Sequence, residues 1–251
     1  MNSKTGRRVA LVTGGSRGIG RAIAVALSRD GVFVALTYNS NKSLADGVVG
    51  EISATGGAAA AYCMKGEDRE SVRRVIGEVR SAVGPIDILV NNAAMAQEKP
   101  FEDITDRDWD RVMGVNLRGA FACSQEVLSD MVRKGWGRII NITSIGGQWG
   151  GVNQVHYAVS KAGLIGLTRS LAKVYGRNGI TANAVAPGLV DTDMTARELK
   201  SQAGLEKVKN IPIGRISTCG EVADAVCFLA SDRAGSITGQ TINVNGGMYF
   251  G

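Results

Sequence analysis

Residues 7–20 read RRVALVTGGSRGIG. The apolar run over 7–13 is typical of a strand that is buried on both faces, and the apolar repeat over 18–30 is typical of a helix. Glycine at positions 14, 18 and 20 allows the backbone between them to turn sharply and to approach a bound group closely. A strand, a glycine-rich turn and a helix in this order predict a dinucleotide site; an ordinary tight turn is the alternative.

The same alternation continues to the end of the chain. We expect further strands at 32–38, 58–64, 86–91, 138–143, 180–186 and 241–244. Helical patterns lie between them at 43–54, 69–81, 106–134, 155–175 and 220–230. Strands that alternate with helices form a parallel sheet with helices on both faces. We therefore predict an α/β protein with a single-domain Rossmann fold, a seven-stranded parallel sheet, and a substrate lid at about 188–213.

The glycine loop also indicates which dinucleotide binds. The residues that we expect at its phosphates are Gly14, Ser16, Arg17, Gly18, Ile19 and Gly20. A site for NAD typically has Asp or Glu about 20 residues further on, but residues 36–40 read LTYNS. Arg17 is suited to a 2′-phosphate, because a guanidinium can bind it through two hydrogen bonds. We therefore predict NADPH or NADP+ rather than NAD, with a solvent-exposed Arg17 as the alternative.

Composition excludes several classes of protein. The chain has 251 residues, 44% of them hydrophobic, which excludes disorder. Its 34 glycines have no three-residue period, which excludes collagen. The 29 basic residues against 23 acidic ones are spread along the chain, so we predict no nucleic-acid partner. The one histidine, His156, cannot form a multi-histidine metal site, and we predict no metal.

Other patterns indicate the compartment. No apolar stretch reaches the about 18 residues of a membrane span, and residues 1–8 lack the apolar core of a signal peptide. The cysteines have no C-x-x-C spacing and lie in apolar stretches; they are Cys63, Cys123, Cys219 and Cys227. We expect buried free thiols, no membrane partner and a cytoplasmic protein.

Tyr157 and Lys161 are candidates for proton chemistry. They are four residues apart in a helical pattern, so they share one helix face. A free tyrosine titrates near pH 10, and a neighbouring ammonium group lowers its pKa towards neutrality. Ser144 follows the strand at 138–143, where a parallel sheet presents its ligand site, and its hydroxyl could bind a substrate carbonyl.

Several motifs occur in the order seen in short-chain dehydrogenases/reductases. They are T-G-x-x-x-G-x-G over 13–20, Asn91-Asn92-Ala93, Asn116, Ser144, Tyr157-x-x-x-Lys161 and Pro187-Gly188. The chain resembles this family over essentially its whole length. Its ending, ITGQTINVNGG over 237–247, is similar to that of 3-oxoacyl-[acyl-carrier-protein] reductases and acetoacetyl-CoA reductases.

The resemblance implies roles for these residues. Tyr157 would donate a proton to a ketone that receives hydride, Lys161 would assist it and bind the nicotinamide ribose, and Ser144 would hold the carbonyl oxygen. Asn116 would anchor a water molecule that passes protons through Lys161. The implied cofactor contacts beyond the glycine loop are Asn39, Ser40, Asn91, Ala93, Tyr157, Lys161, Pro187, Gly188, Val190 and Thr192.

The sequence departs from the family pattern at two places. Ala94 stands where the family tends to have glycine, and Lys65-Gly66 stands where it often has Asp-Val against the adenine. A lysine cannot accept a hydrogen bond from the adenine amino group, so the adenine contacts stay open. His156 precedes Tyr157, and we expect it to wall the pocket or lie at the surface rather than to act in catalysis.

The substrate is predicted less directly. The implied substrate contacts are Ser144, Gly146, Trp149, Gln154 and Tyr157. The resemblance implies NADPH-dependent reduction of a 3-oxoacyl thioester carried on acyl carrier protein or CoA, with carrier docking near Arg133, Lys134 and Arg177. The alternatives are another ketone or alcohol, such as a polyketide, sugar, steroid or small ketone, and a non-catalytic dinucleotide-binding regulator. The family usually forms homotetramers, and we expect one here.

Overall fold

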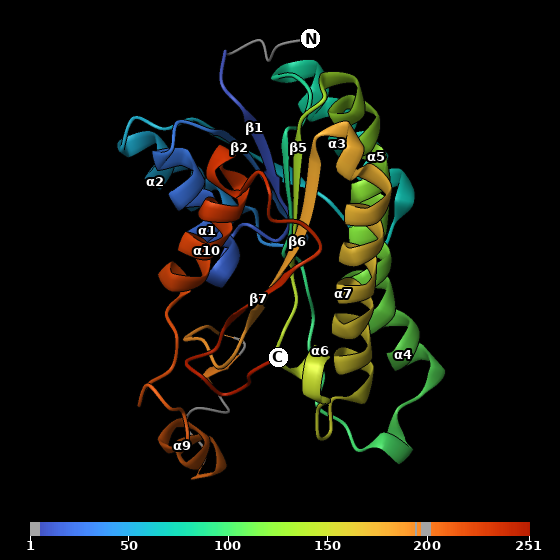
Figure 1. The fold of residues 1–251 in the computed structure, drawn as a ribbon, viewed down its shortest axis with the longest axis vertical. Coiled ribbons are helices and arrows are strands. Elements are labelled where there is room, and N and C mark those ends of the chain that lie inside the picture. The colour runs from blue at the N-terminus through green and yellow to red at the C-terminus, as the bar shows by residue number, and fades with distance from the viewer. Residues whose placement is uncertain (1–5, 194, 197–201) are drawn as a thin grey trace.

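The computed structural model describes residues 6–193, 195–196 and 202–251. Seven strands form one sheet in the order β3-β2-β1-β4-β5-β6-β7 (Figure 1). They are β1 (Val9–Val12), β2 (Phe33–Tyr38), β3 (Ala59–Cys63), β4 (Ile88–Asn91), β5 (Gly137–Ile142), β6 (Ile180–Pro187) and β7 (Thr241–Val244). Every pair of neighbouring strands is parallel. The predicted seven-stranded parallel α/β sheet is confirmed.

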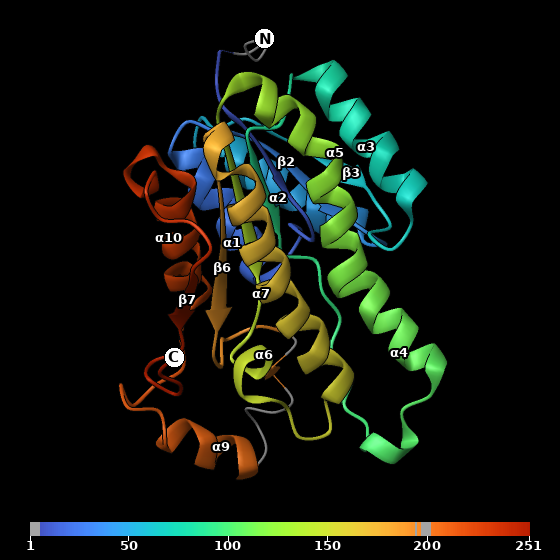
Figure 2. The same cartoon turned by 45° about the vertical axis from the view of Figure 1, so that its right-hand side comes forward.

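Helices cover both faces of the sheet. One face carries α1 (Gly18–Arg29), α2 (Lys42–Ala54) and α10 (Cys219–Ala230). The other carries α3 (Arg69–Ala82), α5 (Gly119–Lys134) and α7 (Val155–Tyr175), as Figure 2 shows. In β1, Ala10 and Val12 pack under the first group of helices, and Val9 and Leu11 under the second. Successive side chains of a strand point to opposite faces, so a sheet covered on both sides needs strands that are apolar throughout.

The remaining helices are short. They are α4 (Asp106–Met113), α6 (Gly146–Trp149) and α9 (Gln202–Lys209), with helical turns at Phe101–Asp103, Gly176–Asn178 and Asp232–Ala234. The predicted helical stretch over 106–134 is confirmed, but it is not one regular α-helix: α4 ends at Met113, a π-helix spans Gly114–Arg118, and α5 follows directly. The helices α6 and α9 were not predicted from sequence. Each is short, and α6 contains two glycines, which gives it a weak helical pattern.

The strand order reverses between β1 and β4, from which the sheet grows in opposite directions. In a parallel sheet, ligands bind at this switch point, outside the carboxyl ends of the strands. The loops after β1, β4, β5 and β6 therefore meet at the carboxyl edge of the sheet. Part of the predicted lid, at 194 and 197–201, lies outside the described residues, and α9 occupies the later part of it.

The amino edge of the sheet is held by a cluster around Trp136. The guanidinium carbons of Arg8 and Arg138 lie 4.0 Å and 4.4 Å from the centroid of its ring. Its Nε1 donates to Asp232 Oδ1 at 3.1 Å, and Arg8 Nη2 donates to both oxygens of that carboxylate at 2.8 Å. The cluster joins the start of β1, the start of β5 and the turn after α10.

No helix within the described ranges is both long enough and apolar enough to cross a membrane. The cysteines are all free. Cys123 is buried, as expected, but Cys63 is exposed and Cys219 and Cys227 are only partly covered. The expectation of four buried thiols is therefore wrong, because Cys63 lies at the end of an edge strand.

Candidate active site

The glycine loop between β1 and α1 lies at the carboxyl edge. Gly14 and Gly18 have φ values of +64° and +52°, in the region that favours glycine. A Cβ on Gly20 would lie 2.2 Å from the carbonyl oxygen of Gly14, so only glycine lets α1 start so close to the turn. The loop therefore presents backbone rather than side chains to whatever binds beside it.

The first turn of α1 is not capped by a side chain. Arg17 at its N-cap makes no capping hydrogen bond, and its first turn has no acidic residue. By contrast, α2, α3, α4 and α10 are capped by Asn41, Asp68, Thr105 and Thr218. Uncapped N–H groups and the positive end of the helix dipole attract an anion. The residues present thus fit a phosphate group at the start of α1.

Hydrogen bonds tie the ends of β1, β2 and β4 together. The Thr13 hydroxyl accepts from the backbone N–H groups of Asn92 and Ala93, both at 3.0 Å. Asn92 Nδ2 donates to the carbonyl oxygens of Thr13 and Gly14 at 2.9 Å and 3.1 Å. Gly14 N donates to Thr37 Oγ1 at 3.2 Å. Ala93 is therefore held against the glycine loop, by polar residues to which the sequence alone assigned no such role.

The residues predicted for a 2′-phosphate lie at the surface near this loop. The Arg17 side chain is 68% exposed, and its Nη1 lies 3.6 Å from Asp193 Oδ2. Asn39 and Ser40 follow β2 and are exposed, as is Lys65 just beyond the neighbouring strand β3. A charged group could reach these side chains from solvent.

Two predicted asparagines are buried. Asn91 Nδ2 donates to Asn141 Oδ1 at 2.8 Å, which joins β4 to β5. Asn116 lies in the π-helix, where its Oδ1 accepts from Met95 N at 2.8 Å and its Nδ2 donates to Ser160 Oγ at 3.0 Å. The side chain of Asn116 thus links the π-helix to the segment after β4 and to the residue before Lys161.

Ser144, Tyr157 and Lys161 come together where β5 ends and α7 begins. Lys161 Nζ lies 5.6 Å from the centroid of the Tyr157 ring and donates to the carbonyl oxygen of Ile142 at 2.8 Å. The Ser144 hydroxyl accepts from Gly146 N at 3.1 Å and lies close enough to the Tyr157 hydroxyl to lower its pKa. A Cβ on Gly147 would lie 2.7 Å from the carbonyl carbon of Lys161, so α6 packs directly on α7 there.

Burial governs the protonation of this group. It raises the pKa of Tyr157, and the hydrogen bond with Ser144 opposes that rise. It lowers the pKa of Lys161 to about 7. The sequence predicts that Lys161 lowers the pKa of Tyr157, but in this structure burial dominates and the net shift is upward. The Lys161 ammonium donates to the Ile142 carbonyl rather than to the phenol oxygen. At neutral pH the tyrosine is protonated, while the lysine exchanges between its two forms.

The segments expected around a substrate adjoin this group. Trp149 is 52% exposed, and its ring meets that of Tyr249 edge to face, with centroids 6.1 Å apart. Gln154 Nε2 donates to Glu98 Oε1 at 3.3 Å. Tyr249 therefore packs against the end of α6, a contact that the sequence gave no reason to expect.

Pro187 and Gly188 lead from β6 towards the glycine loop. Pro187 is the last residue of β6, and a Cβ on Gly188 would lie 2.9 Å from that of Asn245. Val190 is only 2% exposed and belongs to the core, whereas Thr192 reaches the loop: its Cγ2 would lie 3.5 Å from a Cβ on Gly18.

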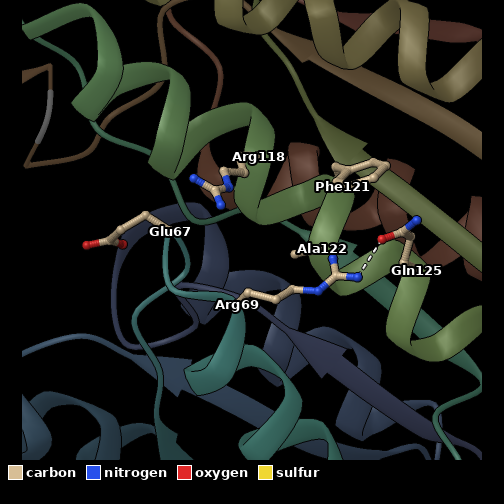
Figure 3. Close-up of a pocket in the computed structure, with 6 residues that line it drawn as sticks. All are labelled: Glu67, Arg69, Arg118, Phe121, Ala122 and Gln125. Carbon is tan, nitrogen blue, oxygen red and sulfur yellow. Dashed lines mark hydrogen bonds between the residues drawn. The ribbon is translucent and has the colours of Figure 1, made fainter.

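Two surface cavities lie near these elements. One, of about 500 Å³, lies along the outer side of α1 and α10 and includes Gly18 and Thr192 in its wall. The other, of about 210 Å³, lies between α3 and α5 (Figure 3). Its wall consists of Glu67, Arg69, Arg118, Phe121, Ala122 and Gln125, none of which is a predicted site residue. Arg69 Nη2 donates to Gln125 Oε1 across it at 2.5 Å.

Comparison with known proteins decides the family. A protein-family model described as enoyl-(acyl carrier protein) reductase matches residues 14–249. The 3-oxoacyl-[acyl-carrier-protein] reductase FabG of Staphylococcus epidermidis is 44% identical over 244 residues, 96% of this chain and 98% of that protein. FabG of Aquifex aeolicus is 44% identical over 99% of this chain and 100% of its own. The acetoacetyl-CoA reductase of Rhizobium meliloti is 43% identical over 97% and 99%. The chain belongs to the short-chain dehydrogenase/reductase family.

This short-chain dehydrogenase/reductase is an oxidoreductase, which sets aside the alternative of a non-catalytic regulator. Membership of the family implies a nicotinamide dinucleotide as cofactor. The glycine loop and the uncapped start of α1 fit its phosphates. The turn after β3 is fixed by a backbone hydrogen bond: Asp68 N donates to Lys65 O at 3.1 Å. Asp68 also caps α3.

The sequence motifs do not mark the residues that hold the predicted site residues in place. In this short-chain dehydrogenase/reductase His156 is fully buried, which excludes the surface alternative for it and leaves the expected position in the pocket wall. Its Nε2 lies 3.0 Å from Gln97 Oε1, a residue with no motif to mark it. Only the fold brings Gln97 and His156, 59 positions apart, into contact.

Proposed function

We propose that this chain catalyses the NADPH-dependent reduction of a 3-oxoacyl thioester to the 3-hydroxyacyl thioester. The observation that carries the proposal is the group of Ser144, Tyr157 and the buried Lys161, at the same edge of the sheet as the loop at the start of α1. The relatives support the substrate class, since their names specify 3-oxoacyl-[acyl-carrier-protein] and acetoacetyl-CoA reduction.

Tyr157 acts as the proton donor in this proposal. The nicotinamide, when bound, supplies the hydride that turns the ketone carbon into an alcohol carbon. Burial raises the pKa of Tyr157, so its hydroxyl carries a proton at neutral pH and can give it to the ketone oxygen. Ser144 lies beside Tyr157, whose pKa it lowers, and would orient the same ketone oxygen.

In this proposal Lys161 returns a proton to Tyr157 after the tyrosine has given its own to the substrate. A phenolate left on Tyr157 is favoured by a cation nearby, and Lys161 Nζ lies 5.6 Å from the ring. With a pKa of about 7, Lys161 can hold or release a proton at neutral pH. Asn116, whose side chain bonds to Ser160, holds the π-helix against this part of α7.

We propose NADPH rather than NADH because of the charged side chains near the place where the adenosine ribose of the cofactor would lie. Arg17 is exposed beside the glycine loop, and the residues after β2 include no carboxylate before Asp46. Asp46 itself is paired with Lys42 at 2.7 Å. A 2′-phosphate would therefore meet a guanidinium and the exposed Asn39 and Ser40.

The carrier of the acyl group stays open between acyl carrier protein and CoA. Arg133 and Lys134 close α5, and Arg177 precedes β6, so all three lie towards the amino edge of the sheet. For Arg133 and Lys134, about 24 Å, the length of α5, separates them from the opposite edge of the sheet, where Tyr157 lies. Arg133 is paired with Asp130 and Lys134 with Asp87, each at 2.5 Å. The acyl group of a carrier docked there would have to span the length of α5 to reach Tyr157.

Three further features remain proposals. We expect a homotetramer, measured by light scattering; a cytoplasmic enzyme, checked by cell fractionation; and a lid at 188–213, checked by proteolysis with and without NADPH. The lid would border the site through Thr192, which reaches the glycine loop.

The test follows NADPH absorbance with acetoacetyl-CoA, an acetoacetyl carrier protein, simple ketones, sugars and steroids. We expect turnover of the thioesters, a preference for NADPH over NADH of at least about tenfold, and loss of at least about 10²-fold in Tyr157→Phe. Turnover of another class with no thioester reduced would discard the substrate proposal. A tenfold preference for NADH would discard the cofactor proposal.

A further inference from the structure

His156 is the only histidine of the chain and the neighbour of Tyr157. Its side chain lies at 0% exposure in the first turn of α7. Its Nε2 lies 3.0 Å from Gln97 Oε1, whereas its Nδ1 has no hydrogen-bond partner among the described residues. The imidazole is therefore held at one nitrogen only.

Gln97 determines which nitrogen of His156 carries the proton. Gln97 Nε2 donates to Asp108 Oδ1 at 2.8 Å. The reverse orientation of the amide would place its oxygen against the carboxylate, where two acceptors repel. Gln97 Oε1 therefore faces His156, and because a carbonyl oxygen can only accept, the imidazole must donate from Nε2.

Asp108 is a firm end for this chain of hydrogen bonds. Its Oδ2 accepts from Lys99 Nζ at 2.7 Å and from Thr105 Oγ1 at 2.6 Å. These hydrogen bonds and those from Gln97 and Thr105 N hold the pKa of Asp108 well below its usual range. The carboxylate stays ionised, so it keeps the Gln97 amide in one orientation.

Two more hydrogen bonds join the same two segments. Lys99 N donates to the carbonyl oxygen of Asn153 at 2.7 Å, and Gln154 Nε2 donates to Glu98 Oε1 at 3.3 Å. Asn153 has φ +54°, and no other non-glycine residue in the described ranges has a positive φ. Contacts strong enough to keep this strained backbone at the start of α7 imply a fixed geometry there.

We propose that the chain His156–Gln97–Asp108 is a positioning device that holds the first turn of α7, and with it the Tyr157 hydroxyl, against the segment that follows Ala93. This inference rests on the proposed role of Tyr157 as proton donor. Only the neutral imidazole fits, since protonation would place a charge and an unpaired N–H at the buried Nδ1. The charged groups that face it are Asp108 of α4, which favours the imidazolium, and Lys99, which opposes it. Burial outweighs Asp108 and lowers the pKa of His156.

A single histidine makes this directly measurable. In untagged protein labelled with ¹⁵N-histidine, two-dimensional NMR resolves one imidazole and reports its tautomer. We expect the Nε2–H form at pH 7 and titration below the ordinary value of about 6.5. Gln97→Leu should change the tautomer balance or the titration, whereas Gln125→Leu, in a glutamine of the crevice between α3 and α5, should change neither (Figure 3). An Nδ1–H tautomer, or ordinary titration in the wild type, would overturn the inference.

Kinetics separates positioning from a merely structural role. We expect His156→Leu and Gln97→Leu to lower kcat by about 10-fold to 100-fold, with the KM for NADPH changed less than about twofold. In the wild type we expect kcat to fall at acid pH, where His156 becomes protonated. His156→Gln, which keeps a donor near the position of Nε2, should restore most of kcat and should not show that fall. Unchanged kcat and pH profiles in the first two variants, with Tyr157→Phe inactive, would refute the positioning role and leave the proposed function standing. An active Tyr157→Phe would instead refute the proposed function.

Discussion

Lys161→Met should stabilise the folded protein while it removes activity. The Lys161 side chain is 2% exposed, and none of the described carboxylates forms an ion pair with it. Burial lowers its pKa from the ordinary 10.5 to about 7, so the fold disfavours its charged form. Methionine has a similar length and no charge, so it fills the same space without this cost.

The magnitude follows from the pKa. At about 1.4 kcal/mol per pKa unit, the difference between 10.5 and about 7 corresponds to about 4–5 kcal/mol near pH 7. The substitution also removes the hydrogen bond to the Ile142 carbonyl, and an unpaired buried carbonyl costs about 1–3 kcal/mol. We expect a net gain in the free energy of unfolding of about 1–4 kcal/mol at pH 7.

The gain should depend on pH with a definite sign. Between about pH 7 and 10.5 the unfolded chain holds a proton on Lys161 that the folded protein has released. Wild-type stability from this group therefore rises with pH across that window, by up to about 1.4 kcal/mol per pH unit. Lys161→Met lacks this rise, so its advantage should shrink from pH 7 to pH 9.

Urea unfolding of both proteins at pH 7, 8 and 9 measures the difference. The raised thiol pKa values of Cys123 and Cys227 affect both proteins alike and cancel. Lys173→Met, at an exposed position of the same helix, is the matched control and should change neither stability nor its pH dependence. A variant less stable than wild type at pH 7, or an advantage that stays constant to pH 9, would refute the reasoning.

Three other substitutions test separate parts of the structure. Arg17→Ala should raise the Kd for NADPH by about tenfold or more and leave the Kd for NADH nearly unchanged, because charge-assisted hydrogen bonds to the 2′-phosphate are lost. Fluorescence titration measures both constants, and an unchanged ratio of the two Kd values would contradict the assignment. Gly20→Ala should destabilise the fold by about 1–3 kcal/mol and weaken dinucleotide binding, since its Cβ would lie 2.2 Å from Gly14 O. Gly50→Ala, with open space around it, is the control, and equal urea midpoints for the two variants would count against the steric argument. Lys134→Met should lower the free energy of unfolding, measured in urea, by about 3 kcal/mol, because it leaves Asp87, 1% exposed, without its cation. Adding Asp87→Asn to this variant should recover the stability, and no recovery would refute the pairing.

The features that the sequence predicted correctly are those that depend on local pattern. Each strand lies under helices on both faces, so it reads as an apolar run, and Gly14, Gly18 and Gly20 mark the turn that follows β1. Tyr157 and Lys161 are one helical turn apart, so their spacing alone places them together.

The features that the sequence missed depend on contacts between distant segments. The π-helix at Gly114–Arg118 has no distinct composition, and its Asn116 bonds to Met95 and Ser160 across the fold. Lys161 Nζ donates a hydrogen bond to the Ile142 carbonyl, and the four-residue spacing of Tyr157 and Lys161 does not predict this contact. The burial of His156 depends on the loop that carries Gln97, a partner 59 positions away.

The Trp136 cluster at the amino edge has a practical consequence for engineering. It ties three chain segments together at the end of the sheet remote from Tyr157, through Arg8, Arg138 and Asp232. Changes that rigidify this end would not enter the space where substrate and cofactor meet. The fold thus separates a region where heat tolerance can be improved from a region where selectivity can be altered, so libraries for the two traits can be built independently and then combined.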